Sequence, residues 1–411
     1  MRSNRIFGAI CTPLAVLAIG LGFIFSSSQT ANALPQFANR YELPCGTCHT
    51  MIPRLTPFGY KFQRAGYRLP DTEAKPHTLL NTTSFLTSMS FQDTNPGGST
   101  GFNVEDAEIQ FAAPIDKHLS SRIMYVFSTA AEASSGFEEA WGQYNTRSDD
   151  KFFTFKAGQI PVLSGFKLSG GRNFTLTDPM LFGNVGPITD PDQGNFSIGG
   201  LQRGVEVGYT SGSLTGKFSW LNGVNAMGEG DKTLAGHRAQ DFALQADYLI
   251  GTEGSSISAF YYHGQTPETT FLVPVLRATE QNYNNQFHRM GVFGSFNYPL
   301  IKESEQHKQL LLELNGGAVW GRDRVDFAGT HANSFGSILE ADLHYGKTAL
   351  AFRFDNIKPS DQLNSPLNGT TEAYTLCLAH QASDFARIAL EYRNQIRPGN
   401  SSITAGLWLF Y

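Results

Sequence analysis

The stretch Thr348–Asn356 reads TALAFRFDN, and its side chains alternate between two kinds. Strict alternation predicts a β-strand, because successive side chains of a strand point to opposite faces. One predicted face is therefore apolar and the other is charged. The first carries Leu350, Phe352 and Phe354, and the second carries Ala351, Arg353 and Asp355.

The same pattern recurs in Asp241–Tyr248, Ser337–Tyr345 and Phe385–Arg393. A soluble sandwich would point its large aliphatic side chains inward. A transmembrane barrel reverses this arrangement, with apolar side chains facing lipid and polar ones facing the lumen. Periodicity alone is compatible with both architectures, so other features have to decide between them.

Composition and the end of the chain favour the barrel. The sequence has 42 Gly, 32 Phe and 15 Tyr, and only 16% of its residues are charged. No apolar run after residue 33 is long enough to cross a bilayer as a helix. The last segment, Ile403–Tyr411, reads ITAGLWLFY and predicts an apolar-faced strand that ends on an aromatic residue. Outer-membrane barrels commonly end in this way, because that strand closes the barrel.

The periodic segments number sixteen, an even number as bacterial barrels require. We therefore expect an all-β fold, an antiparallel outer-membrane β-barrel over residues 77–411. Residues 162–200 predict a long extracellular loop that folds into the pore, while Gly212 and Gly346-Lys347 predict short turns. The predicted strands are 79–92, 103–114, 118–131, 137–147, 151–160, 201–211, 213–225, 240–250, 255–265, 286–298, 308–321, 334–346, 348–357, 371–382, 384–394 and 403–411.

The N-terminus has the pattern of a secretory signal. Arg2 and Arg5 precede an apolar run at Ile6–Phe25, and a small-residue cleavage site, ANA, follows at 31–33. We expect residues 1–33 to be removed rather than kept as a membrane anchor. Because the signal carries two arginines and no acid, the formal net charge changes from −5 to −7. An acidic chain of this kind is a poor nucleic-acid binder.

Behind the signal, Cys45-Gly46-Thr47-Cys48-His49 has the spacing of covalent c-type haem attachment. Each thiol can add to one vinyl group of the porphyrin, and the histidine then binds the iron from the proximal side. A zinc site would need a second ligand pair, and the only other cysteine after the signal is Cys377. A redox dithiol would need a βαβ context that the sequence lacks. The motif predicts one covalently bound haem c, with Cys45 and Cys48 as thioethers and His49 as proximal iron ligand.

Residues 34–76 are expected to form the haem unit. Thr56-Pro57 reads as a helix start and Gly66 as its stop, with Phe58, Phe62 and Ala65 on one apolar face. A unit of about 43 residues is too small to bury a haem by itself, so it is expected to lean on the rest of the chain.

The distal iron ligand is less defined by the sequence. Met51 follows the motif too closely to reach round the porphyrin. His77 is the first candidate and Met180 the second, and Met89 and Met124 could also approach from the barrel. A sulfur ligand would raise the redox potential, whereas a second imidazole would lower it. The remaining histidines, including His344, are expected on the pore wall or in loops.

The lead-in Pro35-Gln36-Phe37-Ala38, the haem motif and the run LTPFGYKFQRAGY at Leu55–Tyr67 precede this predicted barrel. Together they resemble the fused cytochrome–porins of bacterial outer membranes, which include iron-oxidising outer-membrane cytochromes. The resemblance is specific over residues 34–70 and architectural beyond them. It implies a monohaem protein with its haem unit in the lumen or at the barrel mouth. It also implies electron flow from extracellular Fe(II) to periplasmic carriers such as soluble cytochromes.

The apolar band of a barrel is about 25 Å tall, so one haem cannot connect the two sides alone. Either the donor enters the lumen or the haem works as a relay with soluble partners. Predicted lumen-facing acids could concentrate Fe(II), or could simply form a solvated wall paired with Arg353, Arg387 or Arg393. These acids are Asp106, Glu108, Asp247, Glu313, Glu340 and Asp342.

The leading functional hypothesis is extracellular electron transfer, so any enzymatic activity would be that of an iron(II) oxidoreductase. A second hypothesis is a solute-conducting porin whose haem unit is a plug or redox gate. A third is a haem enzyme with an open sixth position, for which no distal His/Arg pair is found near the motif.

Overall fold

The computed structural model describes residues 35–69, 77–95, 100–127, 136–146, 151–164, 174–183, 198–223, 241–251, 254–270, 281–302, 309–325, 330–358, 371–396 and 399–410. The predicted signal, residues 1–33, lies outside the described residues, as do residues 70–76 at the predicted end of the haem unit.

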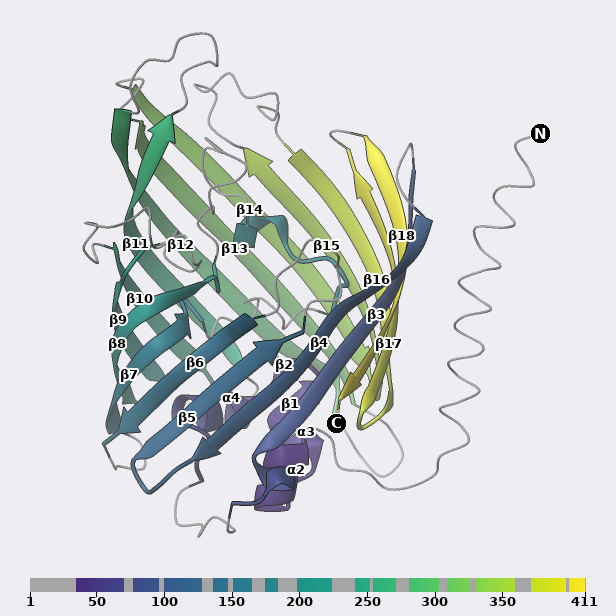
Figure 1. The fold of residues 1–411 in the computed structure, drawn as a ribbon. Coiled ribbons are helices and arrows are strands. Elements are labelled where there is room, and N and C mark those ends of the chain that lie inside the picture. The colour runs from purple at the N-terminus through teal and green to yellow at the C-terminus, as the bar shows by residue number, and fades with distance from the viewer. Residues whose placement is uncertain are drawn as a thin grey trace, which may run out of the picture.

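The described strands form a closed antiparallel barrel of sixteen, and the last strand pairs with the first barrel strand (Figure 1). The predicted number and the predicted closing role of the C-terminal strand are confirmed. The barrel strands are β3 Thr83–Asn95, β4 Thr100–Pro114, β5 Leu119–Val126, β6 Gly136–Asn145, β7 Lys151–Pro161, β8 Leu201–Ser211, β9 Leu214–Leu221, β10 Asp241–Ile250, β11 Ser255–Thr270, β12 Gln281–Ile301, β13 Leu310–Val325, β14 Thr330–Tyr345, β15 Thr348–Lys358, β16 Thr371–Ser383, β17 Ala386–Gln395 and β18 Asn400–Phe410.

Strand ends differ from the prediction most at β12, which spans 21 residues where 286–298 was expected. The residues added at its start are mostly polar, such as Asn282, Asn284 and Asn285. A strand can continue to pair with its neighbours beyond the apolar band of a barrel. Its residues there do not alternate between apolar and polar, so the sequence does not reveal where the strand ends.

The predicted orientation of the strand faces is confirmed. On β15, Leu350 and Phe352 are 43% and 48% exposed on the outside, whereas Arg353 and Asp355 are fully buried on the inside. This is the arrangement of a barrel wall that meets lipid, not of a soluble sandwich. Among the described residues, no helix combines the length and apolar character needed to cross a bilayer.

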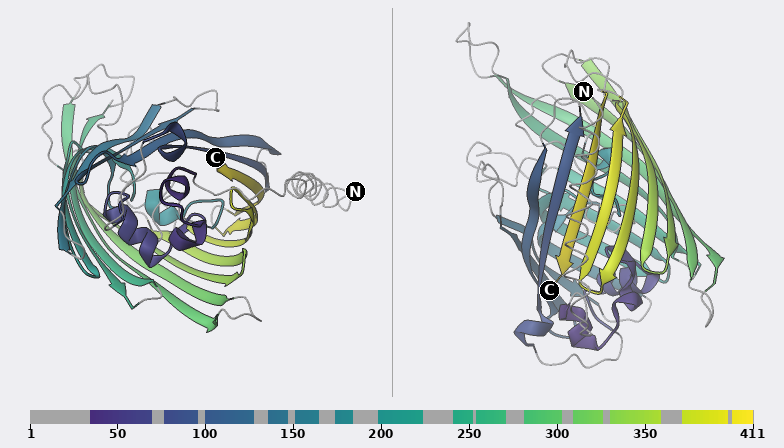
Figure 2. Two further views of the ribbon diagram at one scale, coloured as in Figure 1. Left: turned by 90° about the horizontal axis from the view of Figure 1, so that it is seen from below. Right: turned by 90° about the vertical axis from the view of Figure 1, so that its right-hand side faces the viewer.

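Short turns gather at one end of the barrel. Gly212 and Gly346 have φ values of +56° and +58°, which two-residue hairpin turns require and which glycine adopts without strain. The N-terminal unit lies at this same end and inside the ring of strands (Figure 2). In bacterial barrels the short turns face the periplasm.

The N-terminal unit is built from α2 Pro35–Tyr41, α3 Cys45–Cys48, β1 His49–Met51, β2 Arg54–Leu55 and α4 Pro57–Arg64. The 3-10 turn η1 Leu79–Asn81 then leads into β3. The predicted helix is confirmed: the Thr56 hydroxyl accepts from the Gly59 amide at 3.1 Å, and Gly66 follows the helix end with φ +70°.

The connection between β7 and β8 turns into the barrel, as predicted, over its described residues 174–183. It contains the short helix α5 Met180–Gly183. Glu391 on β17 accepts from the amide of Leu176 at 2.6 Å, and Arg353 on β15 donates to the Thr177 carbonyl at 2.9 Å. Lumen-facing charges of two strands therefore hold this segment against the wall.

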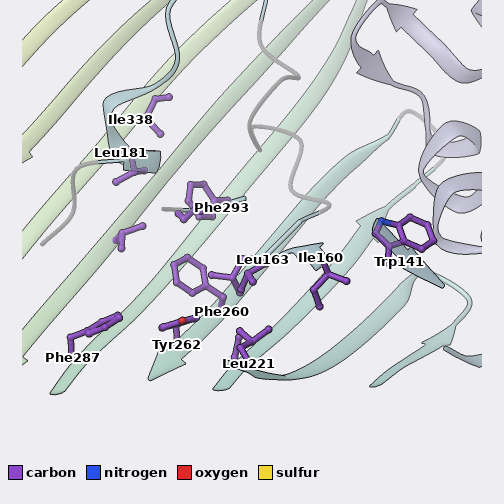
Figure 3. Close-up of a cluster of buried hydrophobic side chains, with 14 of the residues drawn as sticks. Trp141, Ile160, Leu163, Leu181, Leu221, Phe260, Tyr262, Phe287, Phe293 and Ile338 are labelled. Atoms are coloured by element: carbon purple, nitrogen blue, oxygen red, sulfur yellow. The ribbon is translucent and has the colours of Figure 1, made fainter. Parts of the chain in front are cut away.

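The interior of the barrel is not uniformly polar, which differs from the expectation for a lumen. Leu181 of α5 and Leu163 belong to a buried apolar cluster with inward side chains of the wall (Figure 3). The wall contributes large side chains because the inward connection covers them. These include Ile160, Leu221, Phe260, Tyr262, Phe287, Phe293 and Ile338.

A charge on the lipid face tests the placement of the wall. We expect Phe352→Arg to lower the free energy of unfolding by about 2–4 kcal/mol, as charges near a bilayer midplane do. The control, Tyr345→Arg, lies beside a short turn and should cost about 0–1 kcal/mol. Urea unfolding from phospholipid vesicles, followed by tryptophan fluorescence, measures both. Equal costs at the two positions would contradict a bilayer-facing β15.

Candidate functional site

The predicted haem-attachment motif forms one tight turn over Cys45–Cys48, α3, whose geometry is fixed from two sides. The Thr47 amide donates to the Pro44 carbonyl at 3.0 Å. From the following helix, the Thr56 amide donates to the Cys48 carbonyl at 2.9 Å and the Thr56 hydroxyl to the Thr47 carbonyl at 2.7 Å. Thr56 therefore begins α4 and also holds the motif.

Gly59 on α4 lets this helix approach the motif closely. A Cβ at this position would lie 2.3 Å from the Cys48 carbonyl oxygen, far inside van der Waals contact. Only glycine leaves room there, so the sequence FGY at 58–60 serves packing against α3.

Directly after the motif, β1 and β2 form a small hairpin in which His49 pairs with Leu55. Its tip reaches the barrel wall. Met51, 4% exposed, packs in a cluster that includes Ala351 of β15 and Cys377 of β16. Ile52 packs against Phe410, and its carbonyl accepts from Arg387 Nη1 at 3.2 Å.

The strongest contact of the hairpin is made by Arg54, which is 1% exposed. Its Nη1 donates to Glu313 at 2.9 Å, and its Nη2 donates to Glu340 at 2.6 Å and to Asp342 at 3.0 Å. Burial by itself would lower the pKa of Arg54, but the three carboxylates raise it above its ordinary value, so the guanidinium stays charged. The ring of Phe174 lies 4.8 Å from the guanidinium carbon.

The expectation for the acids therefore needs correction. Glu313, Glu340 and Asp342 are not a solvated wall, because each is at most 3% exposed and binds Arg54. Of the predicted arginine partners, Arg353 lies 4.0 Å from Glu340 and binds Asp355 more closely, at 2.7 Å.

The other predicted acids have separate surroundings. Asp247 lies 3.4 Å from Arg64 of α4, and Glu108 accepts from Gln110 at 2.8 Å. The side chain of Asp106 lies outside the described residues.

Sequence reasoning missed Arg54. The signal was available: a single arginine stands between Ile52-Pro53 and Leu55 in an otherwise apolar stretch. A cation in such a stretch needs buried acids as partners. The alternation in Ser337–Tyr345 predicts acids on the inward face, but the sequence could not show which cation contacts them.

A cavity of about 1040 Å³ adjoins the motif. Cys45, Cys48 and His49 all line it, as does Ile52 of the hairpin tip. Its volume is at the upper end of the roughly 300–1,000 Å³ of ligand pockets. Aromatic side chains from the unit and the wall supply an apolar side, namely Phe37, Tyr41, Phe62, Tyr67 and Trp141. Two thiols, an imidazole and an apolar enclosure on one cavity fit the requirements of a covalent haem.

The thiol chemistry bears on the redox-dithiol alternative. Burial, followed by the nearby Cys45, raises the pKa of Cys48 to about 11. Redox dithiols instead have lowered pKa values. The third described cysteine, Cys377, lies on β16 and its thiol contacts the Phe174 carbonyl at 3.4 Å.

The candidates for the distal ligand are placed differently. Met180 of α5 and Met124 of β5 line the same cavity as His49, and Met124 also contacts Arg122 Nη2 at 3.5 Å. His77 is not among the lining residues; its Nδ1 lies 3.2 Å from Arg40 Nη1. Met89 is 42% exposed on the outer wall, so the suggestion that it could approach the haem is wrong.

No protein-family model and no curated protein matches the sequence. Solved structures are similar in fold. OmpT, an outer membrane protein of Vibrio cholerae, aligns with a TM-score of 0.53 at 9% identity, over 80% of this chain and 98% of that chain. An anion-selective porin from Comamonas acidovorans aligns with a TM-score of 0.55 at 10% identity, over 80% and 99%. Identities this low show the fold alone: this chain has the barrel fold of outer-membrane porins.

Removing Arg54 tests how the motif is held. Arg54→Ala leaves three buried carboxylates without their cation, a loss that typically costs about 3–5 kcal/mol. We expect the N-terminal unit to become sensitive to proteinase K while the barrel stays resistant. Lys61→Ala, an exposed change on α4, serves as the control and should cleave like the wild type. Equal cleavage of Arg54→Ala and wild type would mean that the carboxylates do not hold the hairpin.

Proposed function

We propose that this protein is an outer-membrane electron-transfer protein that carries one haem c at Cys45, Cys48 and His49. The observation that supports this most is the shared cavity. The two thiols and the imidazole of the motif line one enclosure, and the hairpin that follows them is fixed to the inner wall of a barrel. Haem, when bound, supplies reversible one-electron chemistry.

The residues of this chain have separate tasks in the proposal. Cys45 and Cys48 attach the porphyrin, and His49 binds iron from the proximal side. Met180 is the favoured distal ligand over His77, because it lines the same cavity as His49. The aromatic side chains around Phe62 exclude water, which together with a thioether ligand would favour a high redox potential.

The position of the unit supports the proposed direction of transfer. The haem motif lies at the end of the short turns, which face the periplasm in bacterial barrels. Soluble periplasmic cytochromes could approach this end. The donor, a small extracellular reductant such as Fe(II), would enter from the opposite end, because one haem is too short to bridge the membrane.

The runner-up is a solute-conducting porin whose haem unit acts as a plug or redox gate. Likeness to porins in fold favours it. Against it, the lumen contains the hairpin, the inward segment 174–183 and a buried apolar cluster, all fixed to the wall. Planar-bilayer recordings discriminate the two: a large conductance that ignores the haem redox state would favour the porin.

Haem attachment and iron oxidation are tested together. We expect wild-type protein and Cys377→Ala to retain haem on a denaturing gel, and Cys45→Ala/Cys48→Ala to lose it, because only thioethers survive denaturation. We also expect anoxic Fe(II) to produce the reduced haem spectrum in the wild type. Covalent haem in the double variant would refute the attachment sites. A haem that Fe(II) leaves oxidised at every accessible pH would refute iron as the donor.

The distal ligand can be assigned from a pair of variants. Met180→Leu removes the thioether, so we expect the low-spin six-coordinate spectrum to become largely high-spin and the potential to fall. His77→Gln should leave both unchanged, because His77 contacts Arg40 and is not among the residues that line the cavity. The reverse pattern, measured by absorption spectra and redox titration, would assign the ligand to His77.

A further inference from the structure

A second group of potential metal ligands lies beside Arg54. Glu313 on β13 and Asp342 on β14 are opposite each other in the strand register, and His344 follows two residues later on the same inward face. One ligand atom from each of the three lies within 4.8 Å of the others. Their exposed fractions are 1%, 0% and 6%, so the group is buried in the barrel interior.

The hydrogen bonds to Arg54 engage one oxygen of each carboxylate and leave the other turned elsewhere. Arg54 binds Glu313 Oε1, whereas Glu313 Oε2 lies 3.8 Å from His344 Nε2. Two ligands of one ion, each at about 2.0–2.2 Å, lie roughly 3–4 Å apart. The Glu313 and His344 atoms therefore already have the separation of a chelating pair.

The second observation is an unmet acceptor. Arg54 and Asn315 both donate to Asp342 Oδ2, at 3.0 and 3.2 Å. Asp342 Oδ1 is also buried, yet no residue that the structure describes donates a hydrogen bond to it. A buried carboxylate oxygen without a donor is costly, and a bound cation satisfies it.

Charge gives the same indication. Three carboxylates, Glu313, Glu340 and Asp342, surround the single guanidinium of Arg54. Three negative charges and one positive charge leave an excess of two negative charges. The next arginine, Arg353, lies 4.0 Å from Glu340 and 2.7 Å from a fourth carboxylate, Asp355. Counting this arginine together with Asp355 adds one charge of each sign and leaves the excess unchanged. A divalent cation would balance the group.

We propose that Glu313 Oε2, Asp342 Oδ1 and His344 Nε2 bind one divalent first-row transition metal ion, with Arg54 on the opposite carboxylate oxygens. Mixed carboxylate and imidazole ligands suit Fe(II), Mn(II) and Zn(II) better than Ca(II) and Mg(II), which prefer oxygen ligands only. The identification of Fe(II) as the natural ion rests on the proposed function, whereas the site itself does not depend on haem. The ion would be held by the same carboxylates that fix the hairpin behind His49.

Phe174 covers the site on the side of the inward segment. Its ring meets the His344 ring edge to face, with centroids 4.8 Å apart, and also lies over Arg54. The proposed site therefore lies between three parts of the chain: the hairpin, the wall and the segment 174–183.

Equilibrium dialysis of the purified holoprotein against Mn(II), after EDTA treatment, tests the site without interference from haem iron. We expect about one Mn(II) per chain and nitrogen coupling in its electron spin echo, which reports the histidine ligand. His344→Gln leaves the ion pairs of Arg54 in place and should weaken Mn(II) binding at least about tenfold. His380→Gln is the matched control, since His380 lies on the outer side of β16 and bonds Thr348 at 2.9 Å; it should bind like the wild type.

Asp342→Asn is a second variant, and it should also weaken Mn(II) binding. In a competition experiment, anoxic Fe(II) should displace the bound Mn(II). Absence of stoichiometric binding in the wild type, or equal binding by wild type and His344→Gln, would overturn the site. Bound Mn(II) without nitrogen coupling would do the same. Covalent haem with no Mn(II) binding overturns the site alone, whereas Mn(II) binding with no haem overturns only the proposed electron transfer.

Discussion

The guanidinium of Arg54 lies among three carboxylates of the barrel wall at 2.6–3.0 Å, and the placement of the N-terminal unit depends on this contact. A buried arginine is tolerable only when charged partners replace water. β13 and β14 supply these partners because their inward residues at Glu313, Glu340 and Asp342 lie side by side in register. This contact therefore fixes the position and direction of the hairpin. It also fixes the position of the motif that precedes the hairpin in the chain.

Most of the barrel could be predicted from the sequence, because one physical rule repeats sixteen times. Alternation in Thr348–Asn356 indicated a strand, and the charged face indicated the lumen, where Arg353 and Asp355 lie. Strand ends were less predictable, since β12 continues into polar residues that carry no alternation. Trp408 and Phe410 of β18 pack on Ile52, a contact that no local pattern encodes.

The candidate site also has one part that the sequence predicts and one part that it does not. The spacing of Cys45, Cys48 and His49 keeps the three residues within one short stretch of chain, so their common surroundings could be predicted from the sequence alone. The relation of Met180 to them depends instead on where the segment 174–183 enters the barrel. That path is set by Glu391 and Arg353, which are distant in sequence and unremarkable on their strands.

The partners of Arg54 lie 259 to 288 residues further along the chain. Contacts this remote form slowly, because a long loop must close before they stabilise anything. The hairpin consequently cannot bind its charged partners until β13 and β14 are paired, although it is synthesised before them. Docking of the N-terminal unit is thus a late step of folding, and β18 closes against β3, the strand that follows this unit, with the unit inside. Assembly of the barrel and enclosure of the motif become one cooperative event.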